Sequence, residues 1–451
     1  MSPPPWLAQP HADALALFTE VEPLAVCLTL APGAEFDRMT PHHIEPGSVG
    51  ADGNYVVNPD YLLFDDLVLL AQLQVEHAEL TAVIRAATGE RGTYDLRTLL
   101  HAVLADPTAR AAIVDEVLDF EVQLGTQLSR VRSLRARLLG LDPVALAVVL
   151  LSGSDPHDQS NLLHFPAPNW LFARDLGAMI GNAVVLGYPR ARARKRDGIL
   201  ARGLVNFHPL FAAVDRLDIR PGLGRISDNE INDLRCIEGG DLLVVAADTV
   251  LIGVGERTTL HAAQALAQLL WDRGVQHVLA VHLPQRRAMM HLDTVFTLID
   301  HHAALLFPAA FSSESPGGDR VHVVDLQHPQ RDLGCDLPLL LAERGHPITT
   351  VPCGDGDPLA AAREQWSDGA NAFCLAPGII VLYQRNTRTL RALNRQGYEV
   401  LTASQFVANA DLLLASARRV VVALAGSELS RGRGGPRCLT WPLSRRSRMD
   451  R

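Results

Sequence analysis

The sequence has 451 residues, of which 50 are acidic and 41 are lysine or arginine, giving a formal net charge of -9 at pH 7. Because this excess of negative charge repels phosphate backbones, we expect no nucleic-acid partner. No run approaches the roughly 18 consecutive apolar residues of a membrane span, and Asp13, Glu20 and Glu22 stand where a signal peptide would be apolar. The six cysteines are widely spaced without a CxxC pair, which favours a reducing, cytoplasmic environment.

Residues 66 to 155 are dominated by helical patterns. Apolar residues recur every three or four positions in EHAELTAVIRAA, LRTLLHAVL, ARAAIVDEVLDFEVQL and LSRVRSLRARLLG. From Asn169 onward the pattern changes to short β-rich runs that are separated by Gly, Pro and Asp-Gly signals, with single helices between them. The sequence therefore predicts a helical segment followed by a mixed α/β region.

The α/β region contains a weak internal repeat. Glu238 is followed by two predicted strands, DLLVV and VLIGV, then by a helix, HAAQALAQLLWDRG, and a third strand, VQHVLAVHL. Asp368 is followed by the same order, and a third hairpin begins at Asn169 in LFARDLGAMIGNAVVLG. Repeated ββαβ units of about 45 residues predict a closed or propeller-like array rather than a doubly wound sheet, with the helical segment as an insertion.

Two stretches of this region carry groups suited to acid-base chemistry. If MMHLDTVFTLID, Met289 to Asp300, is a strand, His291 and Asp293 share one of its faces. Histidine is the usual general base near neutral pH, although a polar sheet edge explains the same spacing. In IEGGD, Glu238 and Asp241 flank a Gly-Gly pair, which by itself is most often a hairpin turn.

Two further stretches carry a candidate ion pair and a candidate nucleophile. Arg174 and Asp175 precede a predicted strand, where such a pair is usually structural. Cys438 lies in a glycine-rich loop beside three arginines, Arg431, Arg433 and Arg437. Positive surroundings lower the pKa of a thiol toward the reactive thiolate, although a lone cysteine is more often buried and inert.

Other readings of the sequence have weaker support. GVGERT, Gly253 to Thr258, lacks the third glycine of a dinucleotide fingerprint and follows a hairpin. The histidines of the α/β region show no zinc-site spacing, so we expect no metal. The basic run RARARKR, Arg190 to Arg196, favours a solvated face or a carboxylate site over phosphate binding in an acidic protein.

Taken in order, seven motifs resemble those of the arginine deiminases, which are members of the guanidino-group modifying (pentein) superfamily. They are PNWLFARDLGAMIGN, HPLF, IEGGDLLVV, VLIGVGERTT, MHLDTVFTLID, EQWSDGAN and SELSRGRGGPRC. The resemblance implies an α/β fold, a five-bladed pseudo-symmetric propeller of ββαβ units with an inserted helical bundle. It divides the chain into a first unit with an N-terminal extension (1–75), the helical bundle (76–160) and the remaining units with the active site (161–451).

The resemblance also assigns catalytic roles. Cys438 falls on the family's nucleophile, His291 on its general acid/base and Glu238 on the glutamate that supports the histidine. Asp175 and Asp293 fall on the carboxylates that hold the substrate guanidinium. The implied reaction is hydrolysis of L-arginine to L-citrulline and ammonia through a covalent thiouronium, without a cofactor.

For the amino-acid end of the substrate, the resemblance assigns binding residues. Carboxylate binding falls on Arg194 and Arg257, with Arg192 or Arg196 as alternatives to Arg194. The remaining contacts fall on Asn169, the backbone of Leu63, Phe172, and a closing loop with Arg433 and Gly435. Family members commonly form homo-oligomers, so we expect one here.

Two alternatives to arginine deimination remain open. One is a related guanidino enzyme, either an amidinotransferase or a deiminase of a modified guanidine, because EPGSVGADGNYVVNP, Glu45 to Pro59, resembles an insertion directly before Leu63. The other is a non-catalytic arginine-binding protein. It predicts the loss of at least one catalytic residue, and none is lost.

Overall fold

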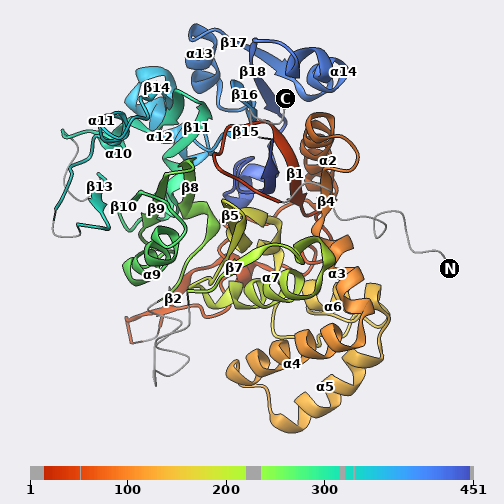
Figure 1. Ribbon diagram of the computed structural model, residues 1–451. Coiled ribbons are helices and arrows are strands. Elements are labelled where there is room, and N and C mark those ends of the chain that lie inside the picture. Colours follow the sequence, from red (N-terminus) through yellow and green to blue (C-terminus); the bar gives the residue numbers. More distant parts are fainter. Residues whose placement is uncertain (1–14, 51, 220–234, 315–319, 329–330, 447–451) are drawn as a thin grey trace.

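The computed structural model describes residues 15–50, 52–219, 235–314, 320–328 and 331–446. Within these residues the strands form several small separate sheets, and five of the sheets have three or four strands (Figure 1). Their strands are β1 (Leu24–Thr29), β4 (Thr93–Asp95), β5 (Gly177–Ile180), β6 (Ala183–Leu186), β7 (Asp215–Leu217), β8 (Leu242–Ala246), β9 (Thr249–Val254), β10 (His277–His282), β11 (Phe296–Asp300), β12 (Ala303–Leu306), β13 (His322–Asp325), β14 (Thr349–Pro352), β15 (Phe373–Ala376), β16 (Ile379–Tyr383), β17 (Tyr398–Thr402), β18 (Arg419–Leu424) and β19 (Trp441–Arg445).

The five larger sheets share one topology. Their strand orders are β19-β1-β4, β5-β6-β7, β13-β10-β9-β8, β11-β12-β14 and β15-β16-β18-β17. Each contains an antiparallel pair whose second strand is followed by a parallel neighbour, as in β8, β9 and β10. The predicted order of hairpin, helix and strand after Glu238 is confirmed by β8, β9, helix α9 (Leu260–Trp271) and β10.

The unit that follows Asp368 differs from this pattern in one respect. After helix α13 (Thr387–Arg395), strand β17 does not pair with β16, because β18 lies between them. Strand β18 contains the buried run Val420–Val422, whereas the central residues of β17 alternate between half-buried and exposed. A continuous apolar run suits the interior of a sheet and an alternating one suits its edge.

The first sheet joins residues from both ends of the sequence. Strand β1 pairs antiparallel with β19, placing Leu28 opposite Trp441, and parallel with β4. The expected boundary between residues 75 and 76 falls inside helix α2 (Leu70–Thr88), and β4 lies beyond it. The first sheet therefore extends further along the chain than predicted, because hydrogen bonding to β1 recruits Thr93–Asp95.

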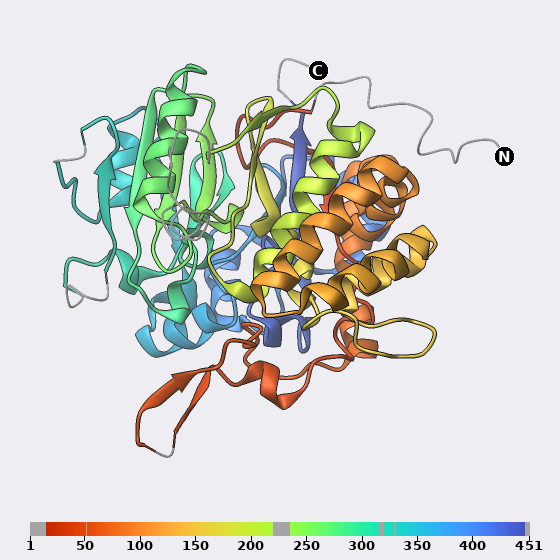
Figure 2. The same cartoon turned by 90° about the horizontal axis from the view of Figure 1, so that it is seen from below.

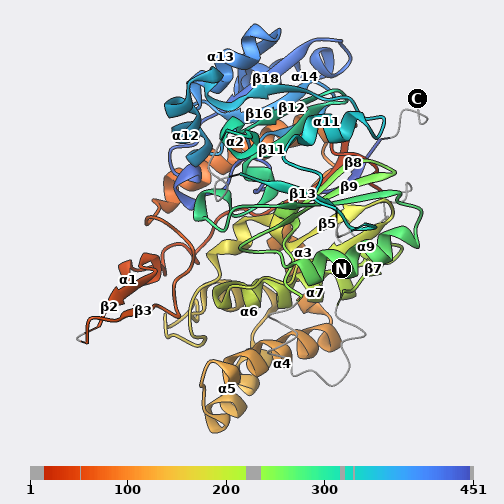
Figure 3. The same ribbon diagram turned by 90° about the vertical axis from the view of Figure 1, so that its left-hand side faces the viewer.

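The helices predicted over residues 66 to 155 are present. They are α2, α3 (Leu96–Ala105), α4 (Pro107–Gln123), α5 (Leu128–Gly140) and α6 (Pro143–Ser152), and α4 and α5 lie at one end of the molecule (Figure 3). Asp106 and Asp142 cap the starts of α4 and α6, each followed by a proline that fits the first helical position. No helix within the described residues has the length and apolar character needed to cross a membrane. The other helices are α1 (Pro41–Ile44), α7 (Lys195–Phe207), α10 (Pro308–Phe311), α11 (Leu337–Ala342), α12 (Pro358–Trp366) and α14 (Ala403–Leu414).

The segment expected to be an insertion before Leu63 forms a hairpin. Strands β2 (Gly47–Val49) and β3 (Tyr55–Val57) pair antiparallel, and the hairpin projects away from the rest of the molecule (Figure 2). All three residues of β3 are exposed.

Candidate active site

The predicted catalytic residues converge from short segments that precede an edge strand in each of four sheets. Asp175 precedes β5, Glu238 precedes β8, His291 and Asp293 precede β11, and Cys438 precedes β19. All five side chains are buried. The structure thus brings together residues that lie far apart in the sequence.

The prediction of a strand through His291 is wrong. Leu292–Thr294 form a 3-10 turn, and strand β11 begins only at Phe296. The backbone N–H of Leu292 donates to Asp241 Oδ1 over 2.9 Å, and Thr294 Oγ1 donates to the carbonyl of His291 over 2.6 Å. These hydrogen bonds take the place of the backbone hydrogen bonds to a neighbouring strand that a β-strand would make at these positions.

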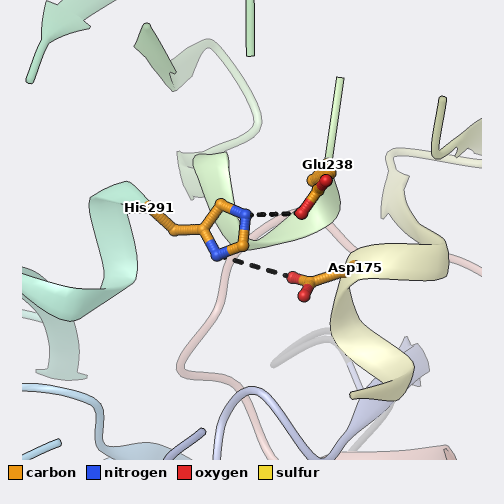
Figure 4. Close-up of side chains that lie close together, drawn as sticks. All are labelled: Asp175, Glu238 and His291. Carbon is orange, nitrogen blue, oxygen red and sulfur yellow. Dashed lines mark hydrogen bonds and ion pairs between the residues drawn. The ribbon is translucent and has the colours of Figure 1, made fainter. Parts of the chain in front are cut away.

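His291 lies between two carboxylates (Figure 4). Its Nε2 is 2.8 Å from Glu238 Oε2, and its Nδ1 is 3.8 Å from Asp175 Oδ1. Burial disfavours the charged ring, but Asp175, Asp241 and Glu238 outweigh this effect and raise the pKa of His291 to about 10. The imidazole is therefore protonated at neutral pH.

Gly240 makes room for this arrangement. A Cβ at this position would lie 2.8 Å from the His291 ring and 2.9 Å from Asp175 Oδ1. Only glycine leaves enough space for the imidazole to sit between the two acids.

The thiol of Cys438 is buried beside a carboxylate. Its Sγ donates to Asp293 Oδ2 over 3.8 Å. Burial raises the pKa of Cys438 well above its ordinary value, and the charges of Asp293, Asp175 and Asp368 raise it further. The expectation that the arginine-rich loop lowers the pKa of the Cys438 thiol is therefore wrong.

The three arginines of that loop are paired with groups other than the sulfur. Arg431 binds Asp66 at the surface, and Arg433 lies over the Trp366 ring with its guanidinium carbon 3.6 Å from the ring centroid. Arg437 Nη1 donates to Asp293 Oδ2 over 2.7 Å. Its charge therefore neutralises the neighbouring carboxylate.

Asn371 supports the loop that carries Cys438, a role that the sequence did not reveal. Its Oδ1 accepts from the backbone N–H of Arg437 at 3.0 Å and of Cys438 at 3.3 Å. Its Nδ2 donates to the carbonyl of Asp293 over 3.0 Å. Gly435 packs against it so closely that a Cβ there would lie 2.5 Å from Asn371 Oδ1. The internal repeat could have indicated this role. Asn371 lies just before the first strand of its unit, β15, as Asp175 lies just before β5.

Arg194, expected at the substrate carboxylate, contacts two carboxylates of the site. Its Nη1 lies 2.6 Å from Asp175 Oδ2 and 3.0 Å from Glu238 Oε2. Among the three candidate arginines, Arg192 is partly exposed near Asp60, and the buried Arg196 donates to the carbonyl of Phe165. Of the three, only Arg194 lines the cavity at the site.

That cavity is small, at about 20 Å³, roughly the space that one water molecule needs. Three buried carboxylate oxygens near it have no hydrogen-bond partner among the described residues: Asp175 Oδ1, Glu238 Oε1 and Asp293 Oδ1. The lining residues are Leu63, Asn169, Phe172, Asp175, Arg194, Arg257, Met290, His291, Thr294, Gly432, Arg433 and Cys438; Glu238, Asp293 and Gly435 are not among them.

The residues expected at the amino-acid end surround the same cavity. Asn169 Nδ2 donates to the Leu62 carbonyl over 2.7 Å, and Leu63 has a positive φ of 67°. Such a backbone conformation is costly for leucine and is often associated with a functional site. Phe172 packs against Phe64 with ring centroids 5.8 Å apart, and Arg257 Nη1 lies 3.6 Å from Glu238 Oε2.

The site could also be considered for a metal ion. Asp175, Glu238 and His291 each offer one ligand atom, and these atoms lie within 4.8 Å of one another. However, the Arg194 guanidinium already contacts both carboxylates, and protonated His291 has no free lone pair for a metal. The arrangement suits a guanidinium better than a metal cation.

Comparisons with known proteins agree with this chemistry. A model of the arginine deiminase family matches residues 60–445. The chain is 33% identical to an arginine deiminase from Mycobacterium marinum, covering 96% of this chain and 98% of that protein. It is 31% identical to one from Streptococcus gordonii, covering 95% and 98%. Among solved structures, the amidinotransferase SxtG from Microseira wollei is similar in fold, with a TM-score of 0.50, 13% identity and coverage of 96% and 98%. The chain belongs to the arginine deiminase family.

Proposed function

We propose that the protein hydrolyses L-arginine to L-citrulline and ammonia, with Cys438 as the nucleophile. The observation that carries this proposal is the convergence of a thiol, an imidazolium and three carboxylates in one buried site. A guanidinium is always protonated in proteins, so its carbon reacts only when carboxylates fix it against a nucleophile.

Asp175 and Asp293 hold the substrate guanidinium. Each has a buried oxygen without a hydrogen-bond partner among the described residues, Oδ1 in both cases. These oxygens can accept N–H groups from opposite edges of the planar guanidinium. Asp293 also lies beside the thiol, so a guanidinium bound there is adjacent to Sγ.

Substrate binding prepares the thiol for attack. In the ligand-free protein the nearby carboxylates favour the neutral thiol, whereas a bound guanidinium places a positive charge next to it. The thiol loses its proton to solvent as the site fills. The Sγ lone pair then forms a bond to the guanidinium carbon, giving a tetrahedral adduct.

His291 serves the two following steps as acid and then as base. Protonated His291 transfers its proton to the departing nitrogen, the C–N bond breaks and ammonia leaves a thiouronium on Cys438. Neutral His291 then takes a proton from water, the hydroxide bonds to the same carbon, and the C–S bond breaks while the new hydroxyl group loses its proton to solvent. This releases citrulline and returns the thiolate.

The proposal is tested by incubating the purified protein with L-arginine, with agmatine and without substrate, and by measuring ureido product and ammonia. We expect citrulline from arginine and none from Cys438→Ser. Cys335→Ser is the matched control, because Cys335 is a free, partly buried cysteine outside the site, and it should retain activity. If arginine is untouched while an alkylating agent labels Cys438 selectively, the enzyme uses another guanidine and the deiminase assignment is wrong.

We further propose the architecture around this site. The shared topology of the five larger sheets supports five blades of an α/β propeller. Helices α3 to α6 would be the inserted bundle, with the first blade reaching Asp95 and the remaining blades following residue 160. We also propose a homo-oligomer, which light scattering of the purified protein tests directly.

A further inference from the structure

Another cavity, which we name the distal cavity, lies at the opposite end of three strands from the proposed catalytic residues. Residues 245–247 line it at the end of β8, His301 and His302 line it after β11, and Arg445 lines it at the end of β19. The proposed catalytic residues lie before the same three strands, and none of them lines the distal cavity. Its volume is about 410 Å³. The distal cavity is therefore separate from the active site.

The distal cavity is lined mainly by basic side chains. They are two arginines and three histidines: Arg445, Arg446, His301, His302 and His346. Glu22 is the one acidic residue among the described residues that line it, and its Oε1 lies 3.6 Å from His301 Nε2. His346 Nε2 lies 2.9 Å from Asp248 Oδ1, outside the lining. In a protein with a net charge of -9, this cavity gathers positive groups in one place.

Arg445 is a buried guanidinium that no carboxylate of the described residues contacts. Only 7% of the residue's surface is exposed. Its Nη1 donates to the carbonyl of Glu22 over 2.6 Å and its Nη2 to the carbonyl of Cys374 over 2.8 Å, whereas its Nε has no hydrogen-bond partner among the described residues. The two carbonyls satisfy N–H groups but bring no negative charge to offset the guanidinium.

The buried carboxylate that attracts Arg445 already serves two other guanidiniums. Glu20 Oε1 lies 3.0 Å from Arg437 Nη2 and 3.7 Å from Arg174 Nη1, and Asp293 also contacts Arg437. Burial raises the pKa of Glu20, but Arg437, Arg174 and Arg445 outweigh this effect and lower it to about 2. This buried group thus combines three guanidiniums with two carboxylates. A buried charge without a counter-charge is costly, so Arg445 favours an anion in the distal cavity.

We propose that the distal cavity binds a small oxyanion, whose phosphate or carboxylate group is held by Arg445 and Arg446. A guanidinium presents N–H groups in a planar fork that matches the oxygens of either group. Two further lining side chains have a polar atom without a hydrogen-bond partner among the described residues, Thr19 Oγ1 and His301 Nε2. The volume falls within the range of about 300–1,000 Å³ that is usual for small-molecule sites. The inference does not depend on the proposed reaction.

The test is calorimetry on the purified full-length protein in a buffer free of other oxyanions. Inorganic phosphate and citrate are titrated separately, so that the two arms distinguish a phosphate from a carboxylate ligand. We expect Arg446→Gln to weaken the anion that binds at least tenfold. The matched control is Arg363→Gln, because Arg363 is also an exposed arginine but lies in α12 and does not line the distal cavity. It removes the same charge and should leave the affinity unchanged.

Two further variants separate the distal cavity from the rest of the protein. Arg445→Gln should abolish binding, with circular dichroism to check its fold; if it does not fold, Arg446→Gln alone carries the test. Arg257→Gln alters the active-site cavity and should leave the affinity for phosphate and citrate unchanged.

Three results would overturn the inference. Binding that Arg257→Gln weakens and Arg446→Gln does not would place the anion in the active site. Equal weakening by Arg446→Gln and Arg363→Gln would show a general effect of net charge. The absence of binding of both phosphate and citrate to the parent protein would refute an oxyanion site outright.

Discussion

Replacing Glu238 by glutamine tests what keeps His291 protonated. The substitution removes the carboxylate oxygen that lies 2.8 Å from His291 Nε2. At about 4 Å between charge centres and an effective dielectric constant near 20, opposite unit charges attract by about 4 kcal/mol. Because about 1.4 kcal/mol corresponds to one pH unit, the pKa of His291 should fall from about 10 by about 3 pH units, to about 7.

The assay is the pH dependence of kcat/KM for citrulline formation. Since His291 must carry its proton to release ammonia, the alkaline limb should move from near pH 10 in the parent enzyme to about pH 7 in Glu238→Gln. The loss of activity should be greater at pH 8.5 than at pH 6. An alkaline limb that stays in place while kcat falls would show that Glu238 does not hold the charge on His291.

The same pair affects stability in a defined direction. A histidine with a raised pKa stabilises the fold fully below its unfolded value of about 6.5, and this contribution is lost as the pH rises through about 10. In urea unfolding, parent and Glu238→Gln proteins should therefore differ more at pH 7 than at pH 10.5. Glu364→Gln is the matched control, because Glu364 is also buried but accepts from Thr389 outside the site. It should lower stability without moving the alkaline limb.

Three further perturbations follow from the site. Asn371→Ala leaves two buried backbone N–H groups unpaired. The free energy of urea unfolding should therefore fall by about 1–3 kcal/mol per group, and kcat should be at least tenfold lower. An unchanged kcat would mean that the loop is held in another way. Gly240→Ala places a Cβ 2.8 Å from the His291 ring, so citrulline formation should be lost in a protein whose circular dichroism is unchanged; retained activity would contradict the need for close packing. Dialysis against EDTA should leave kcat unchanged, because Arg194 already contacts the site carboxylates; loss of activity with recovery on adding a divalent cation would overturn this.

The sequence anticipated the repeat and the residues that meet at the site more successfully than their local geometry. The apolar runs after Glu238 identified β8, β9 and β10 because strand and helix periodicities depend on neighbouring residues. The 3-10 turn after His291 was missed because its Leu292 N–H bonds to Asp241, which belongs to another unit. No local pattern contains that information.

The charge state of the thiol was missed for a related reason. Three arginines stand near Cys438 in the sequence, but Arg437 neutralises Asp293 and Arg433 stacks on Trp366. The motif that placed Arg194 at the carboxylate describes a substrate complex. In the structure its guanidinium contacts the carboxylates of Asp175 and Glu238.

The pairing of β19 with β1 has a consequence for the folding of the enzyme during its synthesis on the ribosome. Cys438 lies three positions before the start of β19, so the other proposed catalytic residues, His291, Glu238, Asp175 and Asp293, are all synthesised before the proposed nucleophile. A growing chain can assemble the earlier sheets, yet it cannot cleave arginine until β19 reaches β1 and delivers the thiol. Among the proposed catalytic groups the thiol is therefore the last to be synthesised, and catalytic turnover requires that β1 and β19 have paired.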